Sequence, residues 1–373
     1  MAAGWLNQSN RQPFLRTDTN ETIAQYYNYS SSKGGDTMWM LVPAISLAIV
    51  QIAGDNVAVV PDIALVIGNG IYSTVIVAYI LLGSIVTGLS AWIGVRTGLN
   101  LVQVMKKMYG TTGKVMLAFI VLAVSLPASA ITGGYFAGLV LQELTGMPQI
   151  ISAACCLVVC ALLAAESGRD WLQLSNYCSL LLLPMLFIMV WHNGFSFPAI
   201  HSPDESISWP LIFALIGYHA GGIRLVLIVE TAALLTKKAA NAIVLTMGAK
   251  VLEGLITVGL AQLVVGSGLY GPLTLSQIAD ASWGQTGAYL FNIILLCTFI
   301  NTMAPAMMVN AKQISVISRL PLLPATAAAV IIIYLLSLVS LCTLLAIMSV
   351  TGLLTVLFLL CVTWMIHQGQ VNN

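Results

Sequence analysis

Long apolar runs separated by short polar connections dominate the chain from residue 38 onward. Because a helix needs about 20 apolar residues to cross the hydrocarbon core of a membrane, each run predicts a transmembrane helix. Ten are counted, near 38–68, 71–95, 115–141, 148–165, 172–192, 209–236, 242–266, 284–310, 322–342 and 344–366. The last two form one continuous apolar stretch, whose length suits two spans and not one.

The pattern predicts an all-α integral membrane protein. A polar tail (1–37) precedes the transmembrane domain (38–366), and a short tail (367–373) follows it. Residues 1–36 have no apolar core, so they do not form a signal peptide.

Composition excludes several classes of function. Charged residues make up only 7% of the chain, against about 25% in soluble domains, which excludes a soluble enzyme. The net charge of +1 gives no reason to expect a nucleic-acid partner. The four histidines lack metal-ligand spacing, and the seven cysteines lie in apolar stretches without a C-x-x-C pair. No catalytic motif is present, so neither enzymatic activity nor a cofactor is expected.

The distribution of basic residues predicts the orientation of the chain in the membrane. Of the 14 Lys and Arg, nine lie in or beside alternate short connections: Arg96, Lys106, Lys107, Lys114, Arg169, Lys237, Lys238, Lys312 and Arg319. The opposite connections, near 66–72, 142–149, 193–208 and 267–283, contain none. Because cytoplasmic loops are enriched in Lys and Arg, both termini are predicted to be cytoplasmic, which requires an even number of helices.

Two predicted spans carry polar and helix-breaking residues in their middle. The first contains Gly54, Asp55, Asn56 and Pro61, and the sixth contains the sequence GYHAGGIR at 217–224. A helix interrupted inside the membrane exposes backbone groups, which are tolerated where they line a cavity. Interrupted helices at matching places in two halves are typical of transporters and predict a five-plus-five inverted repeat.

The interrupted spans supply the first candidate ligand residues. Asp55 and Asn56 suit a polar substrate or a coupling cation, although Asp55 also suits an N-cap of the second half-helix. Tyr218 could stack on a flat ligand and His219 could hydrogen-bond it. The alternative for His219 is a packed residue bonded to a backbone carbonyl.

The eighth span supplies a candidate cation site. Thr298, Asn301 and Thr302 share one helical face and offer three oxygens to a small hard cation. Their alternative role is to bond the backbone of their own helix. In the seventh span Lys250 and Glu253 are three residues apart, so we expect them to pair with each other as a structural ion pair.

One segment resembles a known family. GLSAWIGVRTGLNLVQVMKKMYGTTGK, at 88–114, is similar to the end of the second span and the following loop in the nucleobase–cation symporter family 1. The features shared are a G-x-[KR]-T-G-L turn and an aromatic-Gly-x-x-Gly run, and the cytosine-permease branch looks closest. The resemblance implies a leucine-transporter-like fold with alternating access, driven by Na⁺ or H⁺.

The resemblance also implies a ligand set. Carried over by position, the cation site would use first-span carbonyls near Ile49 and Ile52 together with the eighth-span trio. Substrate contacts would fall near Asp55, Asn56, Ser129, Tyr218, His219 and Gly221, although the family usually has an aromatic residue where this chain has Ser129.

The predicted function is cation-coupled import of a nucleobase, such as cytosine or a purine, or of a related small heterocycle. Two alternatives stay open: an amino-acid or amine carrier on the same fold, and a membrane ligand sensor such as a germinant-receptor subunit. The expected partners are a small-molecule substrate and the lipid bilayer of the cell membrane, and the sequence does not define an oligomeric state.

Overall fold

The structure, a computed structural model, describes residues 69–99, 101–165, 169–192, 228–229, 239–269 and 273–368. Within these ranges every regular element is a helix, which confirms the predicted all-α fold class. The predicted first span lies outside the described residues, and so does the sixth apart from Ile228 and Val229. The described helices therefore belong to the other eight predicted spans.

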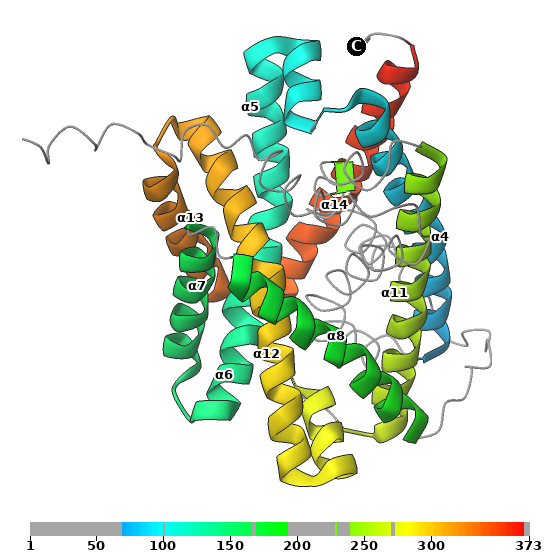
Figure 1. Ribbon diagram of the computed structural model, residues 1–373, viewed down its shortest axis with the longest axis vertical. Coiled ribbons are helices and arrows are strands. Elements are labelled where there is room, and N and C mark those ends of the chain that lie inside the picture. The colour runs from blue at the N-terminus through cyan, green and yellow to red at the C-terminus, as the bar shows by residue number, and fades with distance from the viewer. Residues whose placement is uncertain are drawn as a thin grey trace, which may run out of the picture.

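Helices correspond to all eight of these spans (Figure 1). They are α4 (Asn69–Thr97), α5 (Leu101–Ser129), η3 (Ala130–Phe136), α6 (Ala137–Thr145), α7 (Gln149–Ala165), α8 (Arg169–His192), α11 (Ala239–Ser267), α12 (Thr274–Ser318), α13 (Leu322–Ser337) and α14 (Leu341–His367). The continuous apolar stretch at the end of the chain does contain two helices. α13 ends at Ser337, and the Ser340 side chain caps α14 by accepting from the Thr343 N–H at 3.3 Å.

Two glycines divide long helices into a short arm and a long arm. Gly110 in α5 has φ 63° and ψ −146°, and Gly284 in α12 has φ 73° and ψ 178°. This backbone region is essentially restricted to glycine. The sequence pattern predicts connections over the two short arms, 101–109 and 274–283, whereas both are helical in the structure. The arms form hairpins at opposite ends of the molecule, at the top of α5 and the bottom of α12 in Figure 1.

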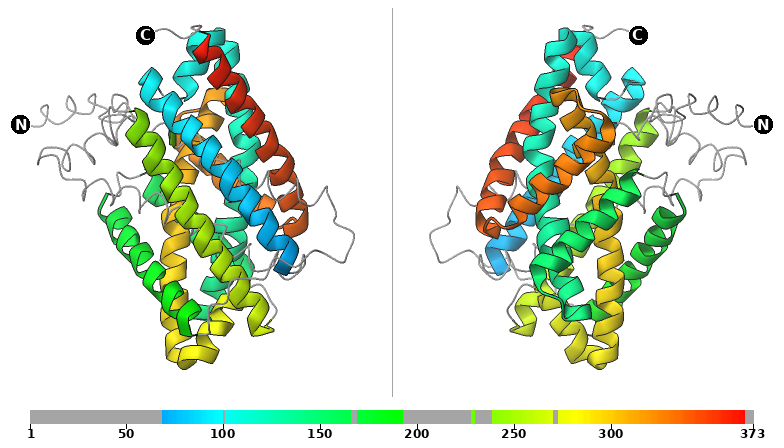
Figure 2. Two further views of the ribbon diagram at one scale, coloured as in Figure 1. Left: turned by 90° about the vertical axis from the view of Figure 1, so that its right-hand side faces the viewer. Right: turned by 90° about the vertical axis from the view of Figure 1, so that its left-hand side faces the viewer.

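The packing of the helices repeats between two halves of the chain. α4 packs on α11 and α5 packs on α12, so equivalent helices of the two halves meet. The remaining contacts also occur in matching sets: α12 contacts α8 as α5 contacts α14, and α6 contacts α7 as α12 contacts α13. α4 and α11 run in opposite directions in Figure 2. This arrangement supports the predicted inverted repeat, whose interrupted first and sixth helices lie outside the described residues.

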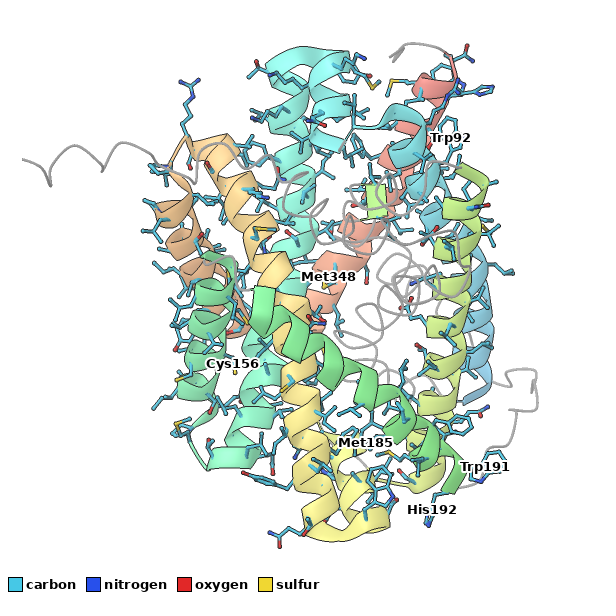
Figure 3. The ribbon with its side chains drawn as sticks, in the orientation of Figure 1. Trp92, Cys156, Met185, Trp191, His192 and Met348 are labelled. Atoms are coloured by element: carbon cyan, nitrogen blue, oxygen red, sulfur yellow. The ribbon has the colours of Figure 1, made fainter. Side chains whose placement is uncertain are left out.

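The interior of the helical bundle is centred on α12. Phe291, Phe299 and Met307 of this helix are fully buried among α5, α7, α8 and α13. Large apolar side chains elsewhere face outward, as lipid contact requires, and five of the described helices are long and apolar enough to cross a membrane. Trp191, near the end of α8, is 74% exposed and stacks on Phe187 with ring centroids 6.0 Å apart (Figure 3). Exposed tryptophans near helix ends are typical of the membrane interface.

Candidate functional site

The predicted cation-binding trio lies on a buried face of α12. Thr298 is completely buried and Asn301 is 4% exposed. The Thr298 hydroxyl donates to the Ile294 carbonyl at 2.7 Å, and the Thr302 hydroxyl donates to the Thr298 carbonyl at 3.2 Å. These bonds are the ones expected if the hydroxyls serve their own helix. Both bonds use the hydroxyl proton and leave lone pairs on the hydroxyl oxygen, so the same oxygens can also coordinate a cation.

The other side of α12 packs against α5 and η3. At about 100° per residue, Met303 and Asn310 share a face, whereas Thr298 and Asn301 point roughly away from it. On the shared face, the space beside Gly133 of η3 is filled by Met303, since a Cβ atom added to Gly133 would lie 2.6 Å from Met303 Cε. α12 therefore has one polar face inside the bundle and one face that binds it to α5.

An amide–hydroxyl bridge joins α5 to α12. The Ser125 hydroxyl donates to Asn310 Oδ1, and Asn310 Nδ2 donates to the Ser129 hydroxyl at 2.9 Å. All three residues are buried. Ser129, predicted to contact substrate, is thus engaged in a contact between helices, and a substrate that bonded it would have to share that hydroxyl with Asn310. Its role in substrate binding stays a prediction.

Asn310 and Ser125 were not predicted from the sequence. The available signal was the spacing of Ser125 and Ser129, which places both on one face of a helix, together with an asparagine inside an apolar segment. Neither signal shows that the two serines bond Asn310, because the bridge joins residues 181 and 185 positions apart in the sequence.

A π-helical turn follows Ser129 directly. In η3 the backbone N–H of Ala137 donates to the Thr132 carbonyl, five residues earlier. Such turns are rare and occur frequently at functional sites. Two adjacent glycines let this turn approach its neighbours closely: Gly133 faces Met303 and Gly134 faces Ser337.

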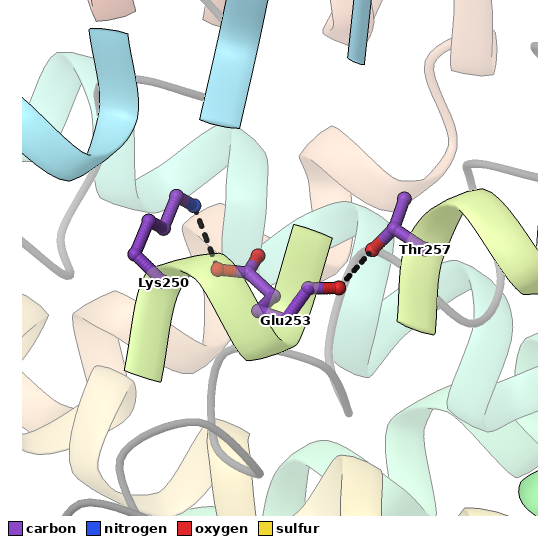
Figure 4. A network of polar contacts seen from close by, with 3 residues as sticks. All are labelled: Lys250, Glu253 and Thr257. Atoms are coloured by element: carbon purple, nitrogen blue, oxygen red, sulfur yellow. Dashed lines mark hydrogen bonds and ion pairs between the residues drawn. The ribbon is translucent and has the colours of Figure 1, made fainter. Parts of the chain in front are cut away.

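Lys250 and Glu253 form the ion pair predicted from their spacing. Lys250 Nζ lies 2.7 Å from Glu253 Oε2, and both side chains are almost completely buried (Figure 4). The Thr257 hydroxyl donates to the backbone carbonyl of Glu253 at 2.8 Å. The pair sits near the middle of α11, where a charge in a membrane helix requires a partner.

The other predicted ligands lie outside the described residues. They are Ile49, Ile52, Asp55, Asn56, Tyr218, His219 and Gly221. Of the predicted site, the structure therefore describes Ser129 and the trio on α12. Within the described ranges no group of three or more His, Cys, Asp or Glu side chains could hold a metal ion.

Comparison with known proteins shows a fold but no family. No family model and no curated protein sequence matches the chain. One similar solved structure is a manganese transporter of Eremococcus coleocola, with 15% identity over 89% of this chain and 81% of that chain and a TM-score of 0.61. Another is MhsT in complex with L-phenylalanine, with 16% identity over 87% of each chain and a TM-score of 0.60. A third is Mhp1, a nucleobase-cation-symport-1 family transporter with bromovinylhydantoin bound, with 17% identity over 78% of this chain and 70% of that chain and a TM-score of 0.57. The chain has the leucine-transporter-like fold that these structures share.

Proposed function

We propose that this chain is a secondary active transporter that imports a small polar solute by alternating access. The observation that carries the proposal is the buried polar face of α12, where Thr298 and Asn301 lie inside the bundle on a largely apolar helix. Polar groups inside membrane helices typically mark ion or substrate pathways. The fold supports the same conclusion, since the manganese transporter and Mhp1 are transporters with this fold.

The coupling ion in this proposal is Na⁺ or H⁺. Hydroxyl and amide oxygens of Thr298, Asn301 and Thr302 suit a small hard cation such as Na⁺. Carbonyls near Ile49 and Ile52 would complete the ligand shell. The cation would favour the outward-open state, and its gradient would drive uptake.

The proposed substrate is a nucleobase or related heterocycle, bound near Asp55, Asn56, Ser129, Tyr218, His219 and Gly221. The resemblance at 88–114 and the hydantoin bound to Mhp1 favour this class. MhsT binds L-phenylalanine on a similar fold, so an amino-acid carrier is the second candidate. A ligand sensor would bind the same solutes without net transport.

Uptake into the cell would follow from the proposed orientation, with both termini cytoplasmic. The described helix ends that carry Arg96, Lys106, Lys114 and Arg319 gather at the top of Figure 1, and the ends near Glu143 and Asp280 lie at the bottom. Such segregation is the one expected when the basic end faces the cytoplasm.

The first experiment is thermal unfolding of the detergent-purified protein with nucleobases, hydantoins, vitamins and amino acids, each with and without Na⁺. A ligand that binds the folded protein raises its melting temperature. We expect a heterocycle to do so, and Na⁺ to enlarge the shift. An amino-acid hit that ignores Na⁺ would favour the second candidate. Uptake into liposomes against a gradient then separates a transporter from a sensor.

The cation site is tested by the double substitution Asn301→Ala/Thr302→Ala. It should abolish the effect of the cation on substrate binding, because it removes two of the three side-chain oxygens. Thr355→Ala is a matched control, since the buried Thr355 hydroxyl also donates to its own helix, to Thr351 O at 2.8 Å. An unchanged cation titration in the double variant would refute the assignment.

A further inference from the structure

A cluster of buried apolar side chains joins segments that are far apart in the sequence. Each segment contributes a valine that is at most 5% exposed: Val86 of α4, Val121 of α5, Val229 of the predicted sixth span, Val309 of α12 and Val356 of α14. Val121 follows Lys114 by seven residues, and Val309 precedes Arg319 by ten. This valine cluster therefore lies in the half of the bundle whose helix ends carry the basic residues, the half proposed to face the cytoplasm.

The valine cluster meets α12 on the same stripe as the predicted cation ligands. At about 100° per residue, four side chains fall within an arc of roughly 60°: Thr298, Thr302, Val309 and Gln313. At 1.5 Å per residue, Val309 is about 10 Å beyond Thr302 toward the cytoplasmic end, and Gln313 is about 6 Å farther along. The stripe thus changes from polar to apolar and back to polar. A solute that left the proposed site along α12 toward the cytoplasm would have to pass the valine cluster.

Gln313 is a buried amide with an unused oxygen. Its side chain belongs to a residue only 5% exposed, and its Oε1 has no hydrogen-bond partner within the ranges that the structure describes. Because most buried polar atoms are hydrogen-bonded, such an atom calls for an explanation. An unsatisfied oxygen disfavours the closed packing of the helices around it, and water that reached the side chain would remove that penalty. Separation of the helices at this end would admit the water.

We infer that the valine cluster is the inner gate of the proposed transport path and that Gln313 favours its opening. The inference rests on the proposed function and deepens it. An apolar constriction excludes water and polar solutes while its side chains stay in contact. Opening exposes the valines to water, which is unfavourable, but it also lets the Gln313 amide form hydrogen bonds. Val309 therefore holds the gate closed, and Gln313 lowers the free energy of opening.

The test measures access to the proposed site from the cytoplasmic side. Thr302→Cys places a thiol beyond the gate, and a charged thiol reagent is applied to inverted membrane vesicles. The same protein without Thr302→Cys gives the background from the seven native cysteines. Gln313→Met replaces the amide by an apolar side chain of similar length, so it should favour the closed gate and slow labelling about tenfold. Val309→Asn puts a polar group into the cluster and should speed labelling about threefold or more.

Gln262→Met is the matched control. Both amide atoms of Gln262 are buried and lack a partner in the described part of the chain. Gln262 lies outside the valine cluster, five residues before the end of α11 at Ser267. Gln313→Met and Gln262→Met should both raise the melting temperature, because each removes unsatisfied polar atoms, but only Gln313→Met should slow labelling. A lower melting temperature for Gln313→Met would show that the amide is satisfied while the gate is closed, and would overturn the inference.

Equal labelling rates with and without Gln313→Met and Val309→Asn, in proteins that remain folded, would overturn it as well. Uptake by the wild-type protein in liposomes separates this failure from a failure of the proposed function. If the wild type accumulates solute but labelling does not respond, the gate is wrongly assigned and the transport function stands. If labelling responds as expected but no solute accumulates, the gate stands and the protein is a sensor.

Discussion

The interfaces α5–α12 and α4–α11 join equivalent helices of the two halves, yet they are built from different chemistry. Both are antiparallel contacts, and glycines lie at close approaches in each: Gly133 of η3, directly after α5, in the first, and Gly88 and Gly254 in the second. At α5–α12 the polar groups are neutral and match: Asn310 accepts from Ser125 and donates to Ser129. At α4–α11 the close contacts are made by the apolar side chains of Ile80 and Met247, and α11 also carries the buried Lys250–Glu253 ion pair.

The difference shows how one architecture can combine a neutral polar contact with a buried pair of charges. A neutral bridge with matched donors and acceptors avoids the large desolvation cost of a charge and specifies one geometry. A buried charge pair is balanced only while both charges are present, so removing one partner is strongly destabilising. We therefore expect the stability of the α5–α12 contact to be insensitive to the salt present.

The largest effect is expected from breaking the neutral bridge with Asn310→Leu. The substitution leaves the buried Ser125 and Ser129 hydroxyls without their partner, which should lower the free energy of unfolding by about 2–4 kcal/mol. Thermal unfolding in choline chloride and in NaCl measures the loss, which should be equal in both.

The matched control for Asn310→Leu is the triple variant Ser125→Ala/Ser129→Ala/Asn310→Leu. Because all three polar groups are replaced, it should regain most of the lost stability. A triple variant no more stable than Asn310→Leu would show that the packing of the asparagine, and not its hydrogen bonds, is what matters.

The glycine contacts of the two interfaces should respond differently to an added methyl group. Gly254→Ala would drive a Cβ atom into the Ile80 side chain, which is β-branched and stiff, so we expect a loss of about 2 kcal/mol. Gly133→Ala would meet Met303 at Cε, Cγ and Sδ, 2.6–2.9 Å away, and this unbranched side chain can change rotamer, so the loss should be smaller. Thermal unfolding of both variants checks the order, and a larger loss for Gly133→Ala would contradict it.

The sequence predicted the described spans well because the membrane imposes a length and a composition on every helix that crosses it. It also predicted the Lys250–Glu253 pair, since three residues along a helix place two side chains side by side. These are local properties. The division between α13 and α14 was predicted from length alone.

The rest depends on contacts that no local pattern describes. The chain has 31 glycines, and nothing near Gly110 or Gly284 identifies them as ones with positive φ. The π-helical turn η3 packs its glycines against side chains of α12 and α13 that are far away in the sequence. The Asn310 bridge is a tertiary contact of the same kind. Of the candidate site, Thr298 and Asn301 are buried, while their role in cation binding stays a prediction.

The comparison of the two halves extends to Gly110 in α5 and Gly284 in α12, which form the hairpins at opposite ends of the molecule. Gly110→Ala and Gly284→Ala should each cost about 1–2 kcal/mol, because a Cβ atom disfavours positive φ. An added Cβ would meet no atom within 4 Å at either position, so the backbone conformation alone should determine the loss. Equal shifts in melting temperature would indicate that both hairpins depend on a glycine with positive φ to the same extent. A loss at only one position would show that the two hairpins are not equivalent.

The smallest effect is expected from Ser129→Ala, which removes one hydrogen bond of the neutral bridge and leaves the Ser125–Asn310 bond in place. The loss of stability should be about 1 kcal/mol, since one amide donor loses its acceptor.

The same variant tests the predicted role of Ser129 in substrate binding. If Ser129 only joins α5 to α12, Ser129→Ala and Ser125→Ala should change KM for uptake to the same small extent. If Ser129 also contacts the substrate, Ser129→Ala should raise KM clearly more than Ser125→Ala at a similar loss of stability. Equal KM values in the two variants would remove Ser129 from the substrate site and leave it as part of the bridge.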